Sequence, residues 1–406
     1  MRGARIALLI ATATLLVAAV PAPSAPPDPV TQRPCFGAAS RDPLTHCADP
    51  SLRLTIFPAP ADALLEPNAP CVPDGRTSLL YPCTFGVRRA ATGAATGTLA
   101  LVGDSHASHW RAAVDVIAAR KGLPAVSITR SRCPFINATV IMPRQERISC
   151  RRWNREVMAY LTSHREISTL FVSDRASARF VKARGKDNLE TQVAGYISLW
   201  RSLPATIQNV VVIRDTPRGS AASTLCVQRA LAARRPAGRR CSRPRAQALH
   251  TDPAVVAARR MNSARVHAID LSDFFCGPRR CLPVVGGAFV YKDGDHISTV
   301  FARTLGPYLL RAYDAILRAS PTARGPSGAL DELRDDERAA AECLIVERLV
   351  AAQAGGWPNI GAEHLQRAKV CRTMLELRAL RLADLGLSGE RNRRNRYVLI
   401  LELLTT

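Results

Sequence analysis

Apolar runs alternate with amphipathic stretches through the middle of the chain. The first run, TLALVGD, ends at Asp104, and the amphipathic stretch ASHWRAAVDVIAAR follows it almost directly. Further apolar runs have the length of buried strands, at 123–130, 168–174, 209–215 and 265–273. Stretches with helical periodicity separate them, at 152–163, 189–203, 224–235 and 252–263. This alternation predicts a three-layer α/β fold, a mostly parallel sheet with helices on both faces.

The same pattern marks where this domain begins and ends. It occupies residues 97–320, which close with FVYKDGDHIS and a helix predicted over 299–317. Residues 31–96 are rich in Cys and Pro with little periodicity, and they predict an irregular extension stapled by disulfides. Residues 321–406 are charged, rich in Leu and Ala and helical in character, and their role is unknown.

The first 30 residues have the pattern of an export signal. Arg2 and Arg5 precede the apolar stretch Ile6–Val20, and a Pro-rich exit of small residues follows. These features predict a secretory signal peptide or, if it is not cleaved, a membrane anchor. Either alternative predicts that the protein is extracytoplasmic, secreted or anchored on the outer face of the cytoplasmic membrane.

The cysteines support that location. Ten of the twelve fall into close sequence neighbours. Such spacing in an exported chain predicts disulfides that close local loops, with neighbour pairing as the simplest connectivity. No C-x-x-C pair occurs, so we expect no zinc site. The predicted pairs are Cys35 with Cys47, Cys71 with Cys83, Cys133 with Cys150, Cys226 with Cys241, and Cys276 with Cys281.

The net charge of +23 does not by itself indicate nucleic-acid binding. Only five of the 56 basic residues are Lys, and the arginines are spread along nearly the whole length. No module that combines basic and aromatic residues appears, so we expect no specific nucleic-acid partner. A charge of this size favours non-specific attraction to anionic polymers and lipid surfaces.

The stretch LVGDSHASHW places Ser105 where an apolar strand ends and a helix begins. In an open α/β sheet, ligands bind beyond the carboxyl ends of the strands. Ser105 is therefore a candidate nucleophile, with backbone N–H groups at the helix start as oxyanion donors. The alternative from this stretch alone is that Ser105 only caps the helix.

A second polar cluster, DGDH at 293–296, supplies what a serine nucleophile needs. A hydroxyl is weak until an imidazole takes its proton, and the imidazole needs an acceptor that orients it. Asp293 can fold back onto His296 through a single turn, whereas Asp295 is expected to point away. The predicted catalytic residues are therefore Ser105, His296 and Asp293.

GDSHASHW together with YKDGDHIS resembles the SGNH hydrolase-like domains associated with acyltransferase-3 membrane proteins, here without a preceding membrane domain. The likeness covers about residues 31–320 and extends to VVVIRDTP and IDLSDFFCGPRRC. It implies an SGNH, flavodoxin-like fold, the same three catalytic residues and no cofactor. It also implies acyl transfer, commonly of acetyl groups, to cell-envelope polysaccharide or glycolipid, or hydrolysis of such esters.

The chain departs from the wider superfamily at the oxyanion hole. An Asn of a G-x-N-D segment usually donates there, but FVSD has Ser173 in its place. Ser173, Asn137 and the N–H of Ser105 are the candidate donors. Because no multi-span membrane segment precedes the motifs, we expect a separate membrane acyltransferase or a soluble carrier to supply the acyl group.

Other polar residues near the motifs have weaker predictions. Asp104 is expected to tie the turn by hydrogen bonds. His106, Trp110 and Arg175 are candidate substrate contacts. His106 and His109 share a helix face, but without a third ligand we expect no metal.

The sequence thus predicts an exported serine O-acyltransferase of the cell envelope. The alternatives are a carbohydrate esterase with the same mechanism, or a non-catalytic glycan-binding module.

Overall fold

The computed structural model describes residues 28–45, 47–66, 71–73, 75, 79–87 and 97–319, with residues 351, 353, 361–364, 366 and 368. The predicted export signal, apart from its last residues, and nearly all of the predicted C-terminal region lie outside the described residues. Cys343 and Cys371 lie outside them too. No helix of the described part has both the length and the hydropathy that crossing a membrane requires.

The chain forms two compact units, each assembled from several segments. The sheet unit comprises the described residues within Asn68–Asp215, His250–Leu271 and Gly306–Thr406, and the small unit comprises those within Met1–Pro67, Thr216–Leu249 and Ser272–Leu305. One helix, α9 (Thr299–Ala319), contributes residues to both.

The sheet unit is built on seven strands in the order β1-β2-β4-β3-β5-β6-β8. The neighbouring strands β4, β3, β5, β6 and β8 are parallel to one another. At one edge, β2 pairs antiparallel with β4, and β1 pairs antiparallel with β2. The parallel part therefore has the flavodoxin-like order, which confirms the predicted fold class. The strands are β1 (Val72–Pro73), β2 (Cys83–Gly86), β3 (Thr98–Gly103), β4 (Pro124–Thr129), β5 (Ile167–Ser173), β6 (Asn209–Ile213) and β8 (Val266–Ile269).

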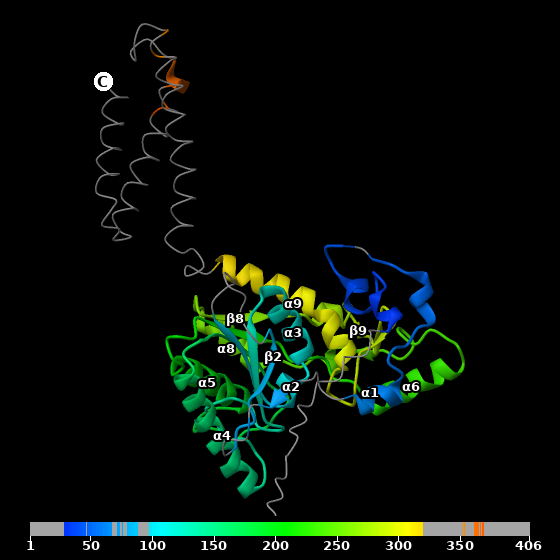
Figure 1. Cartoon of the computed structure of the whole chain (residues 1–406), viewed down its shortest axis with the longest axis horizontal. Helices are drawn as coiled ribbons and strands as arrows, with labels where there is room; N and C mark the ends of the chain where they lie inside the picture. The colour runs from blue at the N-terminus through cyan, green and yellow to red at the C-terminus, as the bar shows by residue number, and fades with distance from the viewer. Residues whose placement is uncertain are drawn as a thin grey trace, which may run out of the picture. The chain divides into compact units, whose positions relative to one another are not determined.

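Helices cover both faces of this sheet because its central strands β3, β5 and β6 bury apolar side chains on both sides. Ala100 and Val102 of β3 belong to a core with α4, α5 and α8, which gather on one face (Figure 1). Phe171 of β5 contacts Tyr313 of α9, and Thr169 hydrogen-bonds to the same tyrosine at 2.8 Å. The helices of this unit besides α9 are α2 (Ser105–Ser108), α3 (Arg111–Lys121), α4 (Arg144–Ser163), α5 (Asn188–Arg201) and α8 (Pro253–Met261).

Two elements of this unit differ from the sequence prediction. Helix α4 begins at Arg144, eight residues before the predicted start at Arg152, because Cys150 shares the buried stripe that Trp153, Val157 and Leu161 continue. Strand β2 lies in the segment predicted to be an irregular extension. It is recognisable only through its pairing with β4, since its residues are all half-buried and show no alternation.

The small unit consists of short elements joined by loops. Helix α6 (Ala221–Ala232) is the longest element that lies wholly within it. The segment FVYKDGDHIS begins at the last residue of a hairpin formed by β10 and β11, so it does not follow a strand of the main sheet. The remaining elements are η1 (Pro29–Gln32), η2 (Gly37–Arg41), η3 (Pro50–Leu54), α1 (Pro60–Leu65), β7 (Arg243–Pro244), α7 (Arg245–Ala248), η4 (Ser272–Phe274), β9 (Arg280–Cys281), β10 (Val284–Val285) and β11 (Ala288–Phe289).

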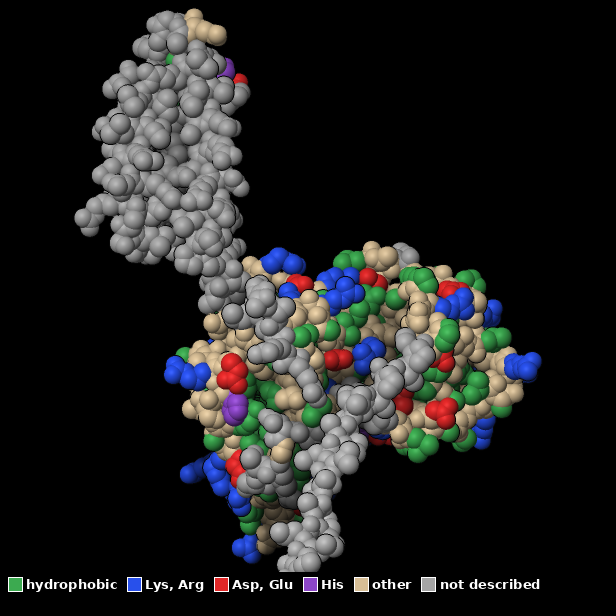
Figure 2. Space-filling view, in the orientation of Figure 1, with side chains coloured by type: hydrophobic (Ala, Val, Ile, Leu, Met, Phe, Trp, Pro, Cys, Tyr) green, Lys and Arg blue, Asp and Glu red, His purple; other side chains and the backbone are tan. Residues whose placement is uncertain are grey.

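All five predicted disulfides form between sequence neighbours. They join Cys35 to Cys47, Cys71 to Cys83, Cys133 to Cys150, Cys226 to Cys241, and Cys276 to Cys281. Five disulfides indicate an oxidising, extracytoplasmic compartment. Lys and Arg side chains are scattered over the face drawn in Figure 2, as their spread in the sequence predicts.

Gly103 ends β3 in a conformation that only glycine tolerates. Its φ is +149°, and a Cβ there would lie 2.2 Å from the carbonyl oxygen of Ser173 and 2.8 Å from Oδ1 of Asp174. The close approach of these two strand ends therefore depends on the absence of a side chain at Gly103.

We expect Gly103→Ala to lower the free energy of unfolding by about 2–5 kcal/mol, because backbone strain and overpacking add. Gly185→Ala is the matched control, since Gly185 also has a positive φ of +72° but meets nothing within 4 Å. It should cost only about 1 kcal/mol. Chemical denaturation of both variants measures the difference, and equal losses would contradict the steric argument.

Candidate active site

Ser105 lies at the junction of a buried strand and a short helix. The residues of β3 from Leu99 onward are buried, and Asp104 caps α2 by accepting the N–H of His106 at 2.8 Å. Ser105 is the first residue of α2 and the only residue between Leu101 and Trp110 that is not buried. The fold therefore presents this one side chain of the motif to the surroundings.

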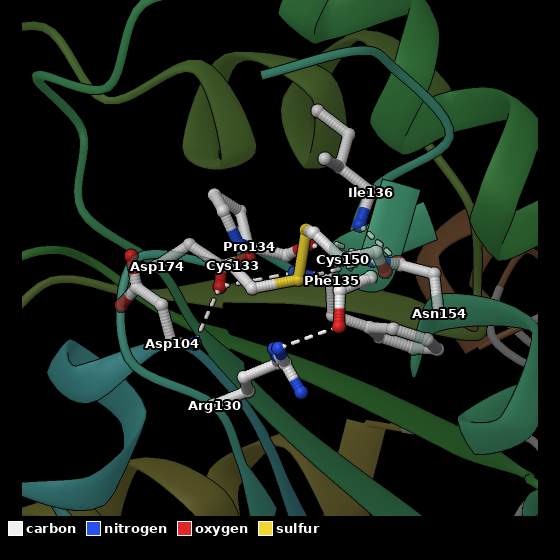
Figure 3. The surroundings of a disulfide bond; sticks show 10 residues. Asp104, Arg130, Cys133, Pro134, Phe135, Ile136, Cys150, Asn154 and Asp174 are labelled. Atoms are coloured by element: carbon white, nitrogen blue, oxygen red, sulfur yellow. Dashed lines mark hydrogen bonds between the residues drawn. A yellow bond between two sulfur atoms is a disulfide. The ribbon is translucent and has the colours of Figure 1, made fainter. Parts of the chain in front are cut away.

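The neighbouring strand end is tied to the same turn. Oδ1 of Asp174, just after β5, accepts the N–H of Asp104 at 2.9 Å and that of Phe135 at 3.2 Å. The hydroxyl of Tyr196 donates to Oδ2 of Asp174 at 3.1 Å. Figure 3 shows Asp104 and Asp174 beside the loop that carries Phe135.

These buried carboxyls have raised pKa values. Burial, and then the charge of Asp104, raise the pKa of Asp174 well above its ordinary value. Burial also raises the pKa of Asp104, while His106 and the N–H groups of His106 and Arg175 lower it by less. The buried environment at the strand ends therefore stabilises the protonated form of these two carboxyls more than bulk water does.

His106 connects the turn after β3 to the end of β6. Its Nδ1 lies 2.6 Å from Oδ1 of Asp215, and both side chains are buried. Since a carboxylate only accepts hydrogen bonds, we assign the shared proton to Nδ1. Oδ2 of Asp215 accepts the N–H of Ala176 at 2.8 Å, so this carboxylate also holds the loop after β5.

Asp252 extends this network to α8. Its Oδ2 accepts the N–H of Asp215 at 2.8 Å, and its Oδ1 accepts the N–H of Ala254 at 2.8 Å as the helix cap. Burial raises the pKa of Asp252 to about 6, with the charge of Asp215 adding to the effect.

The prediction that Asp104 ties its turn by hydrogen bonds is confirmed, but sequence reasoning missed the rest of this network, although a signal for it exists. The runs LVGD, FVSD and VVIRD each reach an aspartate directly after, or two positions after, a parallel strand. We define the strand-end network as Asp104, His106, Asp174, Asp215 and Asp252.

In the small unit, the structure brings Asp293 and His296 together in a tight turn. Tyr291 and Ile297 form an antiparallel bridge around it, and Nδ1 of His296 lies 2.8 Å from Oδ2 of Asp293. The expectation that Asp295 points away is wrong, because its Oδ1 lies 3.4 Å from the same Nδ1, although this is farther than Asp293.

Backbone contacts hold Asp293 in this position. Its Oδ1 accepts the N–H groups of Asp295 and His296, each at 2.9 Å. Burial alone would raise the pKa of Asp293. Hydrogen bonds from the His296 ring and from these two N–H groups outweigh burial and hold the pKa well below its ordinary value. Asp293 is therefore a stable carboxylate that can orient an imidazole.

The candidate oxyanion donors occupy different surroundings. Ser173 pairs in register with Gly103, and its buried hydroxyl has no hydrogen-bond partner among the described residues. The amide of Asn137 donates to the hydroxyl of Ser198 on α5 at 2.9 Å and lines a cavity beside α4. A role for either residue in an oxyanion hole stays a prediction.

The candidate substrate contacts are more enclosed than the sequence suggested. His106 and Trp110 are each 1% exposed, so both occupy packed positions. Arg175 is partly exposed, and its side chain donates to the hydroxyl of Ser177 at 3.1 Å. Substrate contact by these three residues and the absence of a metal ion stay predictions.

Ser105 belongs to the sheet unit, and Asp293 and His296 belong to the small unit. Their pairing as one catalytic site stays a prediction.

Comparison with known proteins gives a family match over most of the described chain. A family model described as the SGNH domain (fused to AT3 domains) matches residues 70–311. A solved structure that is similar is the periplasmic domain of the lipopolysaccharide acetyltransferase of Salmonella ser. Paratyphi A. It is 11% identical and has a TM-score of 0.40, covering 53% of this chain and 84% of that chain. No curated protein matches the chain.

The raised pKa of Asp252 makes stability depend on pH. At pH values between the ordinary pKa of 3.8 and the native pKa of about 6, Asp252 is protonated to a larger extent in the native state than in the unfolded state. The free energy of unfolding therefore falls as pH rises through this window. We expect Asp252→Asn to remove this contribution, which amounts to about 3 kcal/mol at most.

The measurement is urea denaturation of the wild type and of Asp252→Asn from pH 4 to pH 7. The difference between the two curves isolates Asp252 from the other carboxyls, and it should slope across the window and level off above it. A difference that is flat with pH would show that the native pKa of Asp252 is not raised.

Proposed function

The chain belongs to the family of SGNH domains that occur fused to AT3 domains, and from this we propose that it is an exported serine O-acyltransferase. The family match supports acyl-transfer or ester-hydrolysis chemistry. We propose hydroxyls of cell-envelope polysaccharide or glycolipid as the acceptors, and an acyl group of the acetyl type.

Ser105 is the nucleophile in this proposal. Its position at the end of β3, partly exposed among buried neighbours, is the observation that carries the proposal. Its Oγ attacks the carbonyl carbon of an acyl ester, and a tetrahedral oxyanion forms. The N–H of Ser105 and the hydroxyl of Ser173, which has no partner among the described residues, are the proposed donors to that oxyanion.

His296 is the proposed general base and Asp293 the residue that orients it. Because Asp293 engages Nδ1, Nε2 is the ring atom that receives the proton of Ser105. The proton then passes to the leaving alkoxide as the C–O bond of the ester breaks, which leaves an acyl-serine. In the second half, His296 takes a proton from a sugar hydroxyl, whose oxygen attacks the acyl carbon. The bond from this carbon to Oγ then breaks, and His296 returns the proton to Oγ of Ser105.

The donor of the acyl group is proposed to be a separate membrane acyltransferase. This proposal follows from the family, whose domains occur fused to AT3 domains. If water replaces the sugar hydroxyl in the second half, the same residues act as a carbohydrate esterase.

Covalent labelling with a fluorophosphonate tests the nucleophile. We expect labelling of the wild type, none of Ser105→Ala, and full labelling of the control Ser163→Ala, whose serine ends α4. Labelling should also decline at acidic pH, because a protonated imidazole cannot accept the proton of Ser105. A folded wild-type protein that is not labelled would refute the catalytic proposal and favour a glycan-binding module.

Asp293→Asn tests the orienting carboxylate. Replacing the carboxylate by an amide removes its negative charge and introduces an NH2 donor, so the side chain no longer fixes the His296 tautomer that has its proton on Nδ1. We expect the rate of labelling, or of acetyl-ester cleavage, to fall about 10²–10⁴-fold. The control is Asp295→Asn, whose carboxylate lies farther from Nδ1, and it should cost less than tenfold. Equal losses would contradict the assignment of Asp293.

Acetyl-ester turnover with and without an added sugar acceptor separates transfer from hydrolysis. Acetylated sugar as the main product supports the transferase, whereas free acetate in equal amounts under both conditions assigns the esterase.

A further inference from the structure

A cavity of about 510 Å³ lies beside α4 in the sheet unit, and Asn137 is the one residue of its lining that the sequence also suggested for the oxyanion hole. Its size falls within the range of small-molecule sites. Apolar side chains form part of its lining, and polar amides and hydroxyls form another part, including Asn137, Thr139 and Ser202. None of the described residues that line it is acidic.

Three arginines of α4 line this cavity. Arg147, Arg151 and Arg155 are spaced four residues apart, so they share one face of the helix. Arg151 and Arg155 are exposed, Arg147 is partly buried, and none of the three forms an ion pair among the described residues. Figure 2 shows Lys and Arg side chains gathered at its lower left, where Figure 1 places α4.

Other arginines nearby are neutralised by partners. Arg152 donates to Glu156 at 2.8 Å on α4 itself, and Arg132 lies 3.0 Å from Glu146. The acidic side chains of this region are therefore paired with arginines that do not line the cavity. The guanidinium groups of the three cavity arginines are therefore available to a ligand.

The loop that contributes residues 136–140 to the lining is pre-organised. The disulfide from Cys133 to Cys150 joins the loop after β4 to α4, as Figure 3 shows. Asn154 clamps the same loop, since its Oδ1 accepts the N–H of Ile136 at 3.0 Å and its Nδ2 donates to the carbonyl of Pro134 at 3.1 Å. Binding of a ligand therefore does not incur the entropy cost of ordering this loop.

We propose that this cavity binds a segment of an acidic polysaccharide through carboxylate or phosphate groups carried on its sugars. Guanidinium groups recognise both anions by paired hydrogen bonds. Asn137, Thr139 and Ser202 offer donors and acceptors to sugar hydroxyls, and Met158 and Leu199 offer apolar surface to the C–H face of a ring.

The cavity wall is also connected to the turn that carries Ser105. Phe135 belongs to the loop held by the disulfide, and its N–H donates to the oxygen of Asp174 that accepts the N–H of Asp104. If the proposed function holds, on which this step rests, the acidic glycan is the acceptor that the cavity holds for acylation. Binding itself does not depend on that function.

The test is equilibrium binding by calorimetry. An oligogalacturonate hexamer carries carboxylates, a phosphomannan fragment carries phosphates, and maltohexaose is the neutral probe. We expect the wild type to bind at least one anionic probe and not the neutral one. Arg151→Gln should weaken binding about tenfold, and the triple variant of Arg147, Arg151 and Arg155 to Gln about a hundredfold.

Arg152→Gln is the matched control, because it removes the same charge from the same helix outside the cavity. Equal weakening by Arg152→Gln and Arg151→Gln would overturn the proposal and assign the affinity to net charge. Tighter binding of a single-stranded oligonucleotide, lost in the triple variant, would overturn it in favour of nucleic acid. An unchanged melting temperature of the triple variant shows that it is folded.

Ser105→Ala separates this proposal from the catalytic one. It should bind the anionic probe as the wild type does, even if fluorophosphonate labelling of the wild type fails. Binding without labelling refutes only the proposed function, and labelling without binding refutes only the cavity.

Discussion

The hydrogen bond between His106 and Asp215 is the contact on which the strand-end edge depends. Aspartates follow three neighbouring parallel strands, and the flavodoxin-like order brings their carboxyl ends to one edge. Buried carboxyls side by side lose hydration and repel one another. His106 lowers the pKa of Asp104 and hydrogen-bonds to Asp215. A single imidazole therefore stabilises the carboxylates that follow two different strands. Backbone N–H groups and the hydroxyl of Tyr196 satisfy the remaining oxygens.

This arrangement fixes the backbone on both sides of Ser105. Asp104 is held by Asp174 and Arg175, and His106 is held by Asp215 and by the carboxylate of Asp104. A residue between two immobilised neighbours loses little freedom when it reacts, which is the condition for a pre-organised nucleophile. The raised pKa values of the buried carboxyls show that this order costs stability at neutral pH.

What the sequence predicted correctly depended on local patterns. The parallel strands are recognisable because β3, β5 and β6 are apolar and buried along nearly their whole length, and the disulfides because their partners are close in sequence. The contact of Asp293 with His296 spans three residues, so spacing alone suggested it. The antiparallel strand β2 has no such pattern, because its half-buried residues become a strand only by pairing with β4.

The partner of His106 could not be predicted in the same way, because Asp215 is 109 residues away. Their contact follows from the strand order, in which β5 lies between β3 and β6, and the hydrophobic pattern does not specify that order. The motif shows a histidine after the serine, and local reasoning assigned it to substrate. Only the folded sheet shows that its ring points to the end of another strand. The pairing of Ser105 with His296 is of the same long-range kind, and so it depends on measurement rather than on spacing.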